Sequence, residues 1–453
     1  MNQRDIDTIF ALSSGAGVAA VAVVRLSGPA TADILRRLTG RPLPPARKLV
    51  LRTLRDPAEG SIIDEALVTW LPGPGTFSGE DMAELHVHGS RAVVDCLLGV
   101  LSGLDGARPA EAGEFTRRAL LNGRLDLVQV EALADLLRAE TRVQHKLALS
   151  GLVGEGSRRV ESWRRQVTEL LALLEAAIDF VEEEDVAERA LADVPRRVAA
   201  LVDELEAVAR AARPAERMRE GVRVVIAGPP NVGKSSLLNW LAGRPVAIVS
   251  DSPGTTRDVL EVRLDLDGMA VTVFDTAGLR GRTADEIERV GMARAQEALT
   301  EADVVLWLHA PDVREEDVDA QGRVPDGPAV LHLLNKADLL DSIPQGYPDE
   351  AGFDAIISVK TEAGLDKMLG RLRTLVGERF GGAESALFAR ARQRRKIEAA
   401  AKELRLLAER PDLPLEVRAE LARAALRHLD ELIGRVDVED LLDHIFAEFC
   451  IGK

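Results

Sequence analysis

The spacing of apolar and polar positions divides the 453-residue chain into three kinds of region. In residues 1–120, short apolar runs alternate with Gly and Pro, which is typical of strands and helices joined by tight turns. This pattern predicts an α+β domain with a hairpin-rich sheet. Its strands are expected at 18–26, 63–71 and 83–87, and its helices at 30–38 and 92–104.

Two other stretches have helical spacing. Residues 125–218 are rich in Leu, Ala, Glu and Arg and contain few helix breakers, which predicts two or three long helices. The second stretch runs from residue 385 to the end and is interrupted near Pro411 and Pro414. Because an inserted domain leaves its host packed against itself, the two stretches predict one discontinuous helical bundle. One expected apolar face consists of Leu170, Leu171, Leu174, Ala177 and Ile178.

Residues 220–380 alternate strand patterns with helix patterns, which predicts a parallel α/β sheet between the two helical stretches. Asp267-Gly268 separates two apolar runs, and this dipeptide favours a tight hairpin. The main strands are expected at 222–227, 271–274, 304–308, 329–334 and 355–358.

The charge of the chain limits the ways in which it can bind nucleic acid. A formal net charge of -16 argues against a large fixed nucleic-acid footprint, because binding phosphates needs clustered Lys and Arg. Any nucleic acid must therefore meet a local basic patch, or a partner must supply the charge. The clearest basic cluster fits a nucleic-acid contact or a solvated helix face, and it consists of Arg390, Arg392, Arg394, Arg395 and Lys396.

The cellular compartment is indicated by cysteine content and by the start of the chain. Cys96 and Cys450 are the two cysteines, so we expect a reducing cytosol and no disulfide framework. The first residues lack the regions of a signal peptide. No apolar run reaches the roughly 18 residues that a membrane helix needs. We therefore expect a cytoplasmic protein that does not enter a membrane.

A phosphate-binding loop is predicted between a strand and a helix. Residues 228–235 read Gly-Pro-Pro-Asn-Val-Gly-Lys-Ser, with a strand pattern before them and a helix pattern after them. Glycines let backbone N–H groups close on phosphate oxygens, and the start of the helix adds a positive dipole end. Lys234 is expected to reach the β- and γ-phosphates, and Ser235 to bind magnesium.

Two motifs follow in the order that a nucleotide switch requires. Asp275-Thr276-Ala277-Gly278 follows a strand pattern, so that Asp275 can hold the magnesium shell through water and the Gly278 N–H can sense the γ-phosphate. Gly254-Thr255-Thr256 lies where a mobile switch belongs. Thr256 is expected to be the second hydroxyl ligand of magnesium.

The base is expected at Asn335-Lys336-Ala337-Asp338. The Asp338 carboxylate can accept hydrogen bonds from guanine N1–H and the 2-amino group. Adenine offers neither donor, so such a site discriminates by about 10⁴-fold or more. Ser358-Val359-Lys360 would support the base. Together these motifs predict that the chain binds and hydrolyses GTP.

The residue after Gly278 departs from the common GTPase pattern. Leu279 stands where many GTPases carry a water-orienting Gln, and a leucine cannot position water. A cation, a carboxylate or a partner must then do so. Asn231 can offer a side-chain oxygen to a monovalent cation. Glu288 can orient water, although by spacing alone a solvated helix charge is the more common reading.

These residues resemble those of potassium-activated translational GTPases. The resemblance rests on Asn231, Gly254-Thr255-Thr256-Arg257-Asp258 and Asp275-Thr276-Ala277-Gly278-Leu279-Arg280. Further segments are similar to the bacterial tRNA modification GTPases of the MnmE/TrmE family, and the match covers essentially the whole chain. These segments are Phe77-Ser78-Gly79-Glu80-Asp81, Gly113-Glu114-Phe115-Thr116-Arg117-Arg118-Ala119, Asn122-Gly123-Arg124-Leu125-Asp126-Leu127 and Phe449-Cys450-Ile451-Gly452-Lys453.

The resemblance implies a multidomain α/β and α protein. Residues 1–122 would form a tetrahydrofolate-binding-like dimerisation domain, and residues 219–380 a Ras-like P-loop GTPase domain inserted into a helical domain. Residues 123–218 and 381–453 would be the two parts of that helical domain.

The resemblance also implies an activity and partners. With a flavoprotein of the GidA (MnmG) family, in a heterotetramer, the protein would add a carboxymethylaminomethyl group to the wobble uridine of tRNA. A 5-formyl or methylene tetrahydrofolate would supply a one-carbon unit. The alternative is a GTPase switch in ribosome assembly without modification chemistry.

Site residues follow from the motifs and the resemblance together. The family's folate contacts map onto Arg25, Glu84, Arg124 and Lys453, and its potassium site maps onto Asn231, Ser250, Ser252 and Thr255. Magnesium is assigned to Ser235 and Thr256, and catalysis to Asn231, Lys234 and the water-orienting Glu288. GTP or GDP would contact Asn231, Val232, Gly233, Lys234, Ser235, Ser236, Ser250, Thr255, Thr256, Asp275, Thr276, Ala277, Gly278, Asn335, Lys336, Asp338, Ser358, Val359 and Lys360.

Three further candidates have a more ordinary interpretation. Cys450 fits a small buried side chain better than a nucleophile. His86 and His88 alternate on one strand, but no further ligand accompanies them at metal spacing. The acidic run 182–185 is typical of a solvated helix end.

Overall fold

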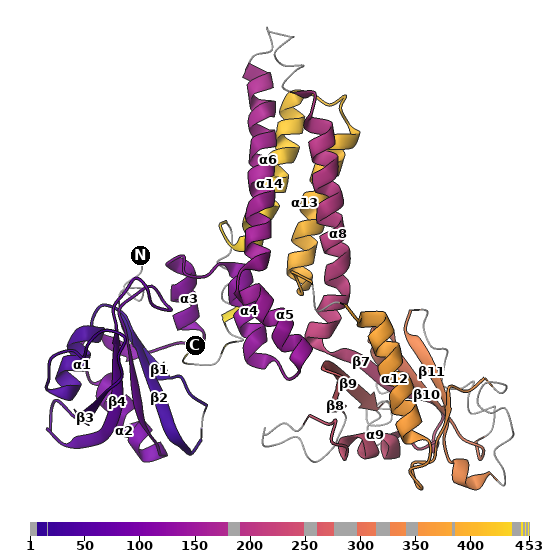
Figure 1. Ribbon diagram of the computed structural model, residues 1–453, viewed down its shortest axis with the longest axis horizontal. Helices are drawn as coiled ribbons and strands as arrows, with labels where there is room; N and C mark the ends of the chain where they lie inside the picture. The colour runs from indigo at the N-terminus through magenta and orange to yellow at the C-terminus, as the bar shows by residue number, and fades with distance from the viewer. Residues whose placement is uncertain are drawn as a thin grey trace, which may run out of the picture. The chain divides into compact units, whose positions relative to one another are not determined.

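The structure is a computed structural model that describes residues 7–15, 17–179, 191–248, 261–275, 297–313, 327–340, 352–382, 386–436, 445–446, 449 and 452. The chain forms two compact units (Figure 1). The first comprises residues 1–134, 157–165 and 426–453, and the second comprises residues 135–156 and 166–425. Each unit therefore consists of segments that are separate in the sequence, and the boundaries between the units fall within three helices, α4, α6 and α14.

A six-stranded sheet lies at the centre of the first unit, with strand order β3-β4-β5-β2-β1-β6. Neighbouring strands are antiparallel, except that β1 and β6 are parallel. The strands are β1 (Thr8–Leu12), β2 (Ala19–Ser27), β3 (Val50–Arg55), β4 (Ile62–Leu71), β5 (Met82–Gly89) and β6 (Ala107–Pro109). The expected α+β class and the three expected strands are confirmed. The sequence pattern misses β1, β3 and β6; β1 is buried along most of its length and so lacks the alternation on which strand prediction depends.

Two helices cover one face of this sheet. They are α1 (Thr31–Thr39) and α2 (Arg91–Ser102), and they confirm the expected helices at 30–38 and 92–104. Val24 of β2 and Leu85 of β5 are buried in the same cluster as Leu35 and Leu97 of the helices. Since side chains alternate along a strand, Arg25 and Glu84 lie on the opposite face.

Short helices and the chain end complete the first unit. α3 (Glu114–Leu121) follows the sheet, and α4 (Leu127–Arg138) begins just after it. Phe446 and Phe449 are buried against Leu127 and Val130 of α4. The C-terminal residues are thereby part of the same unit as the N-terminal sheet.

The second unit contains the expected parallel sheet, with strand order β12-β11-β10-β7-β9-β8. All neighbouring pairs are parallel except β8 and β9, which form the predicted hairpin through Asp267 (φ 56°) and Gly268 (φ 87°). The strands are β7 (Val222–Ala227), β8 (Glu261–Leu266), β9 (Met269–Asp275), β10 (Val304–His309), β11 (Ala329–Leu334) and β12 (Ala355–Ile356). The last strand is shorter than the expected 355–358, and Ser358 instead forms an isolated bridge with Ala363.

Helices α9 (Lys234–Ala242) and α12 (Leu365–Phe380) belong to this sheet region. Their residues Leu238 and Leu372 are buried in one large cluster with Val224, Leu306 and Leu333 of the strands. This packing fixes the start of α9, and with it the loop that precedes the helix.

The helices before and after the sheet region pack together, as the discontinuous bundle requires (Figure 1). Arg394 of α13 donates to Glu216 of α8 (Nε–Oε1 2.7 Å), and Arg423 of α14 pairs with Glu175 of α6 at 2.9 Å. The bundle helices are α5 (Arg142–Leu152), α6 (Glu155–Asp179), α8 (Val194–Glu220), α13 (Ala391–Glu409) and α14 (Leu415–Ile433). In the apolar face expected on α6, Leu170, Leu174 and Ala177 are buried.

Within the described residues, the helices are too short or too polar to cross a membrane.

Candidate nucleotide site and N-terminal charged cluster

The predicted phosphate loop lies between β7 and α9, and its backbone requires glycine at two places. Gly228 has φ +135°, and a Cβ there would lie 2.4 Å from the carbonyl oxygen of Leu308. Gly233 has φ +100°, and a Cβ there would lie 2.4 Å from Asn335 Nδ2. The loop can therefore pass this close to its neighbours only without side chains. Asn231, at its exposed tip, has φ +64°.

Lys234 is buried and folds back over the loop. Its Nζ donates to the carbonyl oxygens of Gly228 at 2.8 Å and Pro229 at 2.7 Å. No side chain caps the start of α9. Uncapped backbone N–H groups at a helix start, with an ammonium group beside them, are suited to bind phosphate.

Ser235 and Asp275 come together beside this loop. Asp275 ends β9, which pairs with β7, and its Oδ2 accepts a hydrogen bond from Ser235 Oγ at 2.6 Å. A hydroxyl and a carboxylate are the hard oxygen ligands that magnesium prefers, so this pair fits the expected metal.

The predicted base-binding residues converge through Asn335. Its Nδ2 donates to the carbonyl oxygen of Val232 at 2.7 Å, and its Oδ1 accepts from the Val359 N–H at 3.2 Å. The buried Asn335 thus joins the phosphate loop to residues 358–360. Because parallel strands end at one edge of the sheet, four motifs far apart in sequence meet there.

Asp338 is held in its ionised form. Ser358 Oγ donates to Asp338 Oδ1 at 2.7 Å, and this hydrogen bond lowers the pKa of the Asp338 carboxyl. Lys360 Nζ lies 3.5 Å from Oδ2. An ionised carboxylate accepts hydrogen bonds only, as recognition of guanine N1–H and the 2-amino group requires.

Asp312 is a neighbour of the site that the sequence analysis does not predict. Lys336 Nζ donates to its Oδ2 at 2.6 Å, which lowers the pKa of Asp312. Asp312 follows β10, and the rule that ligands bind at the carboxyl ends of parallel strands would have indicated it.

Several predicted residues lie outside the described part of the chain. The potassium site is described only at Asn231, and the water-orienting role has no described residue. Those outside are Ser250, Ser252, Thr255, Thr256, Thr276, Ala277, Gly278, Leu279, Glu288, Cys450, Lys453 and the acidic run 182–185.

Arg25 and Glu84 form the centre of a second charged cluster, on the face of the N-terminal sheet opposite α1 and α2. They are cross-strand partners, and Arg25 donates to Glu84 Oε1 from Nη2 at 2.9 Å and from Nε at 3.2 Å. The Arg25 guanidinium also lies 5.8 Å from the Phe77 ring centroid and 5.9 Å from that of Phe115. Charge and aromatic surface are thereby combined at one place.

Of the other predicted folate contacts, Arg124 and the residue before Lys453 are described. Arg124 Nε donates to the carbonyl oxygen of Thr76, next to Phe77, at 3.1 Å. Ser13, which follows β1, donates from Oγ to the carbonyl oxygen of Gly452 at 2.9 Å. The residue before Lys453 is therefore placed at the same sheet.

The remaining candidates have local partners. His88 Nδ1 is hydrogen-bonded to Asp64 Oδ1 at 2.8 Å, and His86 Nε2 lies 3.4 Å from Glu84 Oε2. Within the described residues, no three His, Cys, Asp or Glu side chains gather as a metal ion would need. In the basic cluster, Arg390 and Arg394 are ion-paired and largely buried, which leaves them unsuited to a nucleic-acid contact.

Known proteins match this chain over nearly its whole length. The family model described as the GTP-binding protein TrmE N-terminus matches residues 8–124, and the MnmE helical domain model matches residues 127–450. A tRNA modification GTPase MnmE of Methylobacterium sp. (strain 4-46) is 50% identical over 449 residues, covering 99% of this chain and 100% of that protein. The protein of that name from Methylorubrum populi (strain ATCC BAA-705 / NCIMB 13946 / BJ001) is 50% identical over 450 residues, with 99% and 98% covered. The chain therefore belongs to the MnmE (TrmE) family of tRNA modification GTPases.

Proposed function

We propose that this protein hydrolyses GTP and uses the hydrolysis in tRNA modification. The observation that carries the proposal is the convergence of Lys234, Asp275, Asn335 and Asp338 at the carboxyl edge of one parallel sheet. Family membership and the name of its relatives support the tRNA substrate.

The phosphates would be bound by the backbone of residues 228–235 and by Lys234. On GTP binding, Lys234 would exchange the carbonyl oxygens of Gly228 and Pro229 for β- and γ-phosphate oxygens. Ser235 would bind magnesium and Asp275 would hold the metal's shell through water. The ion would neutralise charge that develops between the β- and γ-phosphates. Asn231 would bind potassium at the exposed tip of the loop, together with Ser250, Ser252 and Thr255.

The remaining roles in hydrolysis fall on the switch segments. Thr256 would complete the magnesium shell, and Glu288 would orient the attacking water in place of the missing Gln. The uncapped start of α9 supports phosphate binding, and the 2.6 Å contact between Ser235 and Asp275 supports the metal assignment.

The N-terminal cluster would bind a tetrahydrofolate derivative. Arg25, Arg124 and Lys453 would bind the carboxylates of the folate, because Arg and carboxylate form paired hydrogen bonds. Glu84 would accept hydrogen bonds from the pterin ring. A flavoprotein of the GidA (MnmG) family would join the protein in a heterotetramer that adds the carboxymethylaminomethyl group to wobble uridine, in the cytoplasm.

The N-terminal domain would also form the homodimer. Val21, Leu51 and Leu67 are exposed on the sheet face that α1 and α2 leave uncovered. Contact with a second copy would remove this apolar surface from water. In this scheme residues 1–122 dimerise, 219–380 bind nucleotide, and 123–218 with 381–453 form the helical domain.

The nucleotide assignment is tested by Asp338→Asn. An amide at this position offers a donor to guanine N1–H, so GTP affinity falls by about 10²-fold or more while xanthosine triphosphate affinity rises. Calorimetry with both nucleotides measures the change, and Asp366→Asn, on the exposed side of α12, serves as the control. Unchanged GTP affinity, or ATP held as tightly as GTP, contradicts the proposal.

The cation assignment has a separate test. GTP turnover in potassium should exceed turnover in sodium, and Asn231→Ala should reduce the potassium rate to the sodium rate. Equal rates in both salts would remove potassium from the mechanism while leaving GTP binding intact.

A further inference from the structure

The chain crosses twice between the helices and the inserted sheet, and both crossings meet at Asp135 of α4. The first crossing runs from α8 into β7, and Arg219 of α8 lies 3.3 Å from Asp135 (Nη1–Oδ1). The second leads into α13, where Arg390 donates to Asp135 from Nη2 at 2.7 Å and from Nε at 3.1 Å. The crossings also touch directly, because Arg219 Nε donates to the carbonyl oxygen of Ala389 at 2.9 Å.

Burial makes this carboxylate difficult to replace. The side chains of Asp135, Arg219 and Arg390 are only 15%, 23% and 14% exposed. Arg219 also pairs with Glu220, but Asp135 is the carboxylate that Arg219 and Arg390 share, in a place that water reaches poorly. Its removal would break the link between the two arginines.

The next helix, α5, connects these crossings to the β8–β9 hairpin. Gln144 and Thr141 form a capping box at the start of α5, and Gln144 Nε2 also donates to the carbonyl oxygen of Arg219 at 3.0 Å. The Val143 N–H donates to the carbonyl oxygen of Gly268 at the hairpin tip at 3.1 Å. Arg263 of β8 pairs with Glu140 at 2.9 Å.

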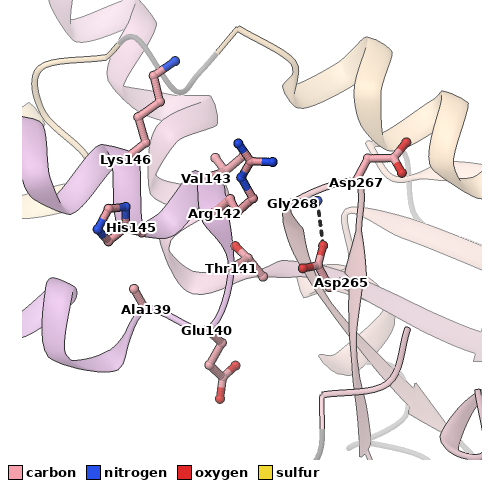
Figure 2. Close-up of a pocket in the computed structure, with 10 residues that line it drawn as sticks. All are labelled: Ala139, Glu140, Thr141, Arg142, Val143, His145, Lys146, Asp265, Asp267 and Gly268. Carbon is pink, nitrogen blue, oxygen red and sulfur yellow. Dashed lines mark hydrogen bonds between the residues drawn. The ribbon is translucent and has the colours of Figure 1, made fainter. Parts of the chain in front are cut away.

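Open space and charged groups border this contact, while Leu147 and Val143 of α5 pack into the apolar core of the second unit. Figure 2 shows a pocket between the first turn of α5 and the hairpin, with Arg142 and Lys146 on one side and Asp265 and Asp267 on the other. The pocket has a volume of about 850 Å³, and a second cavity of about 170 Å³ lies beside Arg219 and Arg263. A contact with open space along one side can change its geometry at lower cost than one that is close-packed all round.

The hairpin is attached at both ends to the proposed nucleotide site. β9 ends at Asp275, the proposed magnesium residue, and β8 follows the segment that contains Thr255 and Thr256. A displacement at either end is carried along paired strands to Gly268, and from there to α5.

We propose that Asp135 is a positioning residue that holds both crossings in a fixed position relative to α4. When the nucleotide changes, the resulting movement of the β8–β9 hairpin is then transmitted to α5. We call this arrangement the clamp. This proposal rests on the proposed GTPase function. Without Asp135, the hairpin would still respond to the nucleotide. The two crossings would then change their own positions, and α5 would not move.

The test compares full-length wild-type protein with Asp135→Asn by amide hydrogen exchange. Each is measured with GDP and with a non-hydrolysable GTP analogue, in magnesium and potassium. In the wild type, peptides covering 223–242 and 139–152 should both differ between the nucleotides. In Asp135→Asn, the difference at 223–242 should persist, and the difference at 139–152 should fall at least fivefold.

Glu216→Gln is the matched control. Glu216 is 15% exposed and pairs with Arg394, 17% exposed, so its loss breaks a similarly buried ion pair between α8 and α13 without involving α4. It should retain the wild-type difference at 139–152. Asp135→Glu, which keeps the charge, should restore part of the lost difference.

The outcomes separate the two proposals. An Asp135→Asn protein with the full wild-type difference at 139–152 overturns the clamp, as does a Glu216→Gln protein that loses it equally. Wild-type protein without any difference at 223–242 overturns the GTPase function first. If Asp135→Asn fails to fold, Arg390→Gln removes the two hydrogen bonds from the second crossing. The same selective loss supports the clamp, and a wild-type response refutes it.

Discussion

At the nucleotide site, Lys234 and Asp338 have the main chain or a hydroxyl group as their first hydrogen-bond partner, whereas in the N-terminal sheet the charged side chains pair with one another. Lys234 donates to two carbonyl oxygens and Asp338 accepts from Ser358. Arg25 and Glu84 instead form an ion pair. Beside them, Arg118 is shared between Glu80 and Glu114.

The difference concerns what a ligand must displace. A phosphate that takes Lys234 from Gly228 and Pro229 replaces two neutral carbonyl oxygens with charged oxygens. A ligand carboxylate that takes Arg25 must compete with the Glu84 carboxylate, which then needs a new donor. The nucleotide site therefore already holds its charged groups in a form suited to its ligand, whereas the proposed folate site would first have to break its own ion pair.

The largest effect is expected where that charge balance is most buried. Glu114 accepts from Arg108 at 2.5 and 2.8 Å, from Arg118 at 3.1 Å and from the Glu111 N–H at 2.9 Å. Glu114→Gln removes the carboxylate that Arg108 and Arg118 share and leaves Asp7 and Glu80 as their remaining acidic partners. The free energy of unfolding should therefore fall by about 3 kcal/mol at pH 7. Chemical denaturation followed by circular dichroism measures the loss.

The pH dependence of this loss has a definite sign. Burial alone would raise the pKa of Glu114, but hydrogen bonds from Arg108 and the Glu111 N–H outweigh it and lower the pKa. A lowered carboxyl pKa stabilises the fold above the unfolded value of about 4.3, and this contribution is lost as pH falls through the folded pKa. The gap between wild type and Glu114→Gln should therefore close below about pH 4.3. A gap that stays constant to acid, or an equal loss in the exposed control Glu65→Gln, would contradict the charge-balance account.

Lys234→Ala removes the cation from the nucleotide site and should be the largest single loss of activity. Loss of one preorganised donor to a developing charge lowers kcat by about 10²–10³-fold. GTP turnover is the measurement, and Lys367→Ala, on an exposed part of α12, is the control. Turnover within a few-fold of wild type would mean that phosphate binding does not depend on this ammonium group.

The two regions also differ in how far the sequence predicts them. Residues 228–235 specify strand, loop and helix within one contiguous segment, because Gly228 and Gly233 occupy backbone conformations that other residues rarely adopt. The parallel sheet, the hairpin at Asp267-Gly268 and the convergence of motifs at one edge follow from the same local patterns and from the order of the strands.

The N-terminal cluster cannot be derived in this way. Arg25 and Glu84 are brought together only by the register of β2 and β5, and Gly452 reaches β1 only through tertiary packing. An arginine or glutamate in a strand has the same local pattern whether it faces solvent or a ligand. Arg25 and Glu84 are predicted as ligand contacts only by the resemblance to a family, because the periodicity of the sequence does not distinguish them. Asp135 escaped prediction for the same reason, since its partners are 84 and 255 residues away.

Arg25→Gln should weaken binding of 5-formyltetrahydrofolate by about tenfold. A charge-assisted hydrogen bond contributes about 1.5–3 kcal/mol, and part of this is offset because Arg25 must leave Glu84. Isothermal calorimetry with the full-length protein measures the affinity, with Arg55→Gln at the exposed end of β3 as control. If Arg25→Gln and Glu84→Gln act independently in a double-mutant cycle, the two side chains do not share the ligand as proposed.

The smallest effect, on GTP affinity, is expected at Asp312. Its ion pair with Lys336 is a side-chain pair at the nucleotide site, like those in the N-terminal sheet. Lys336 belongs to the predicted base-binding motif, and Asp312 holds its ammonium group at 2.6 Å while remaining half exposed. Exposed ion pairs contribute only about 0.2–1 kcal/mol, so Asp312→Asn should weaken GTP binding by no more than about fivefold. Raising the salt concentration should shrink the difference further, because the pair is open to solvent. A cycle with Lys336→Gln distinguishes positioning from mere proximity: if Asp312 acts by orienting Lys336, its substitution has no effect once the lysine is gone. A loss as large as that of Asp338→Asn would instead mean that Asp312 contacts the nucleotide itself.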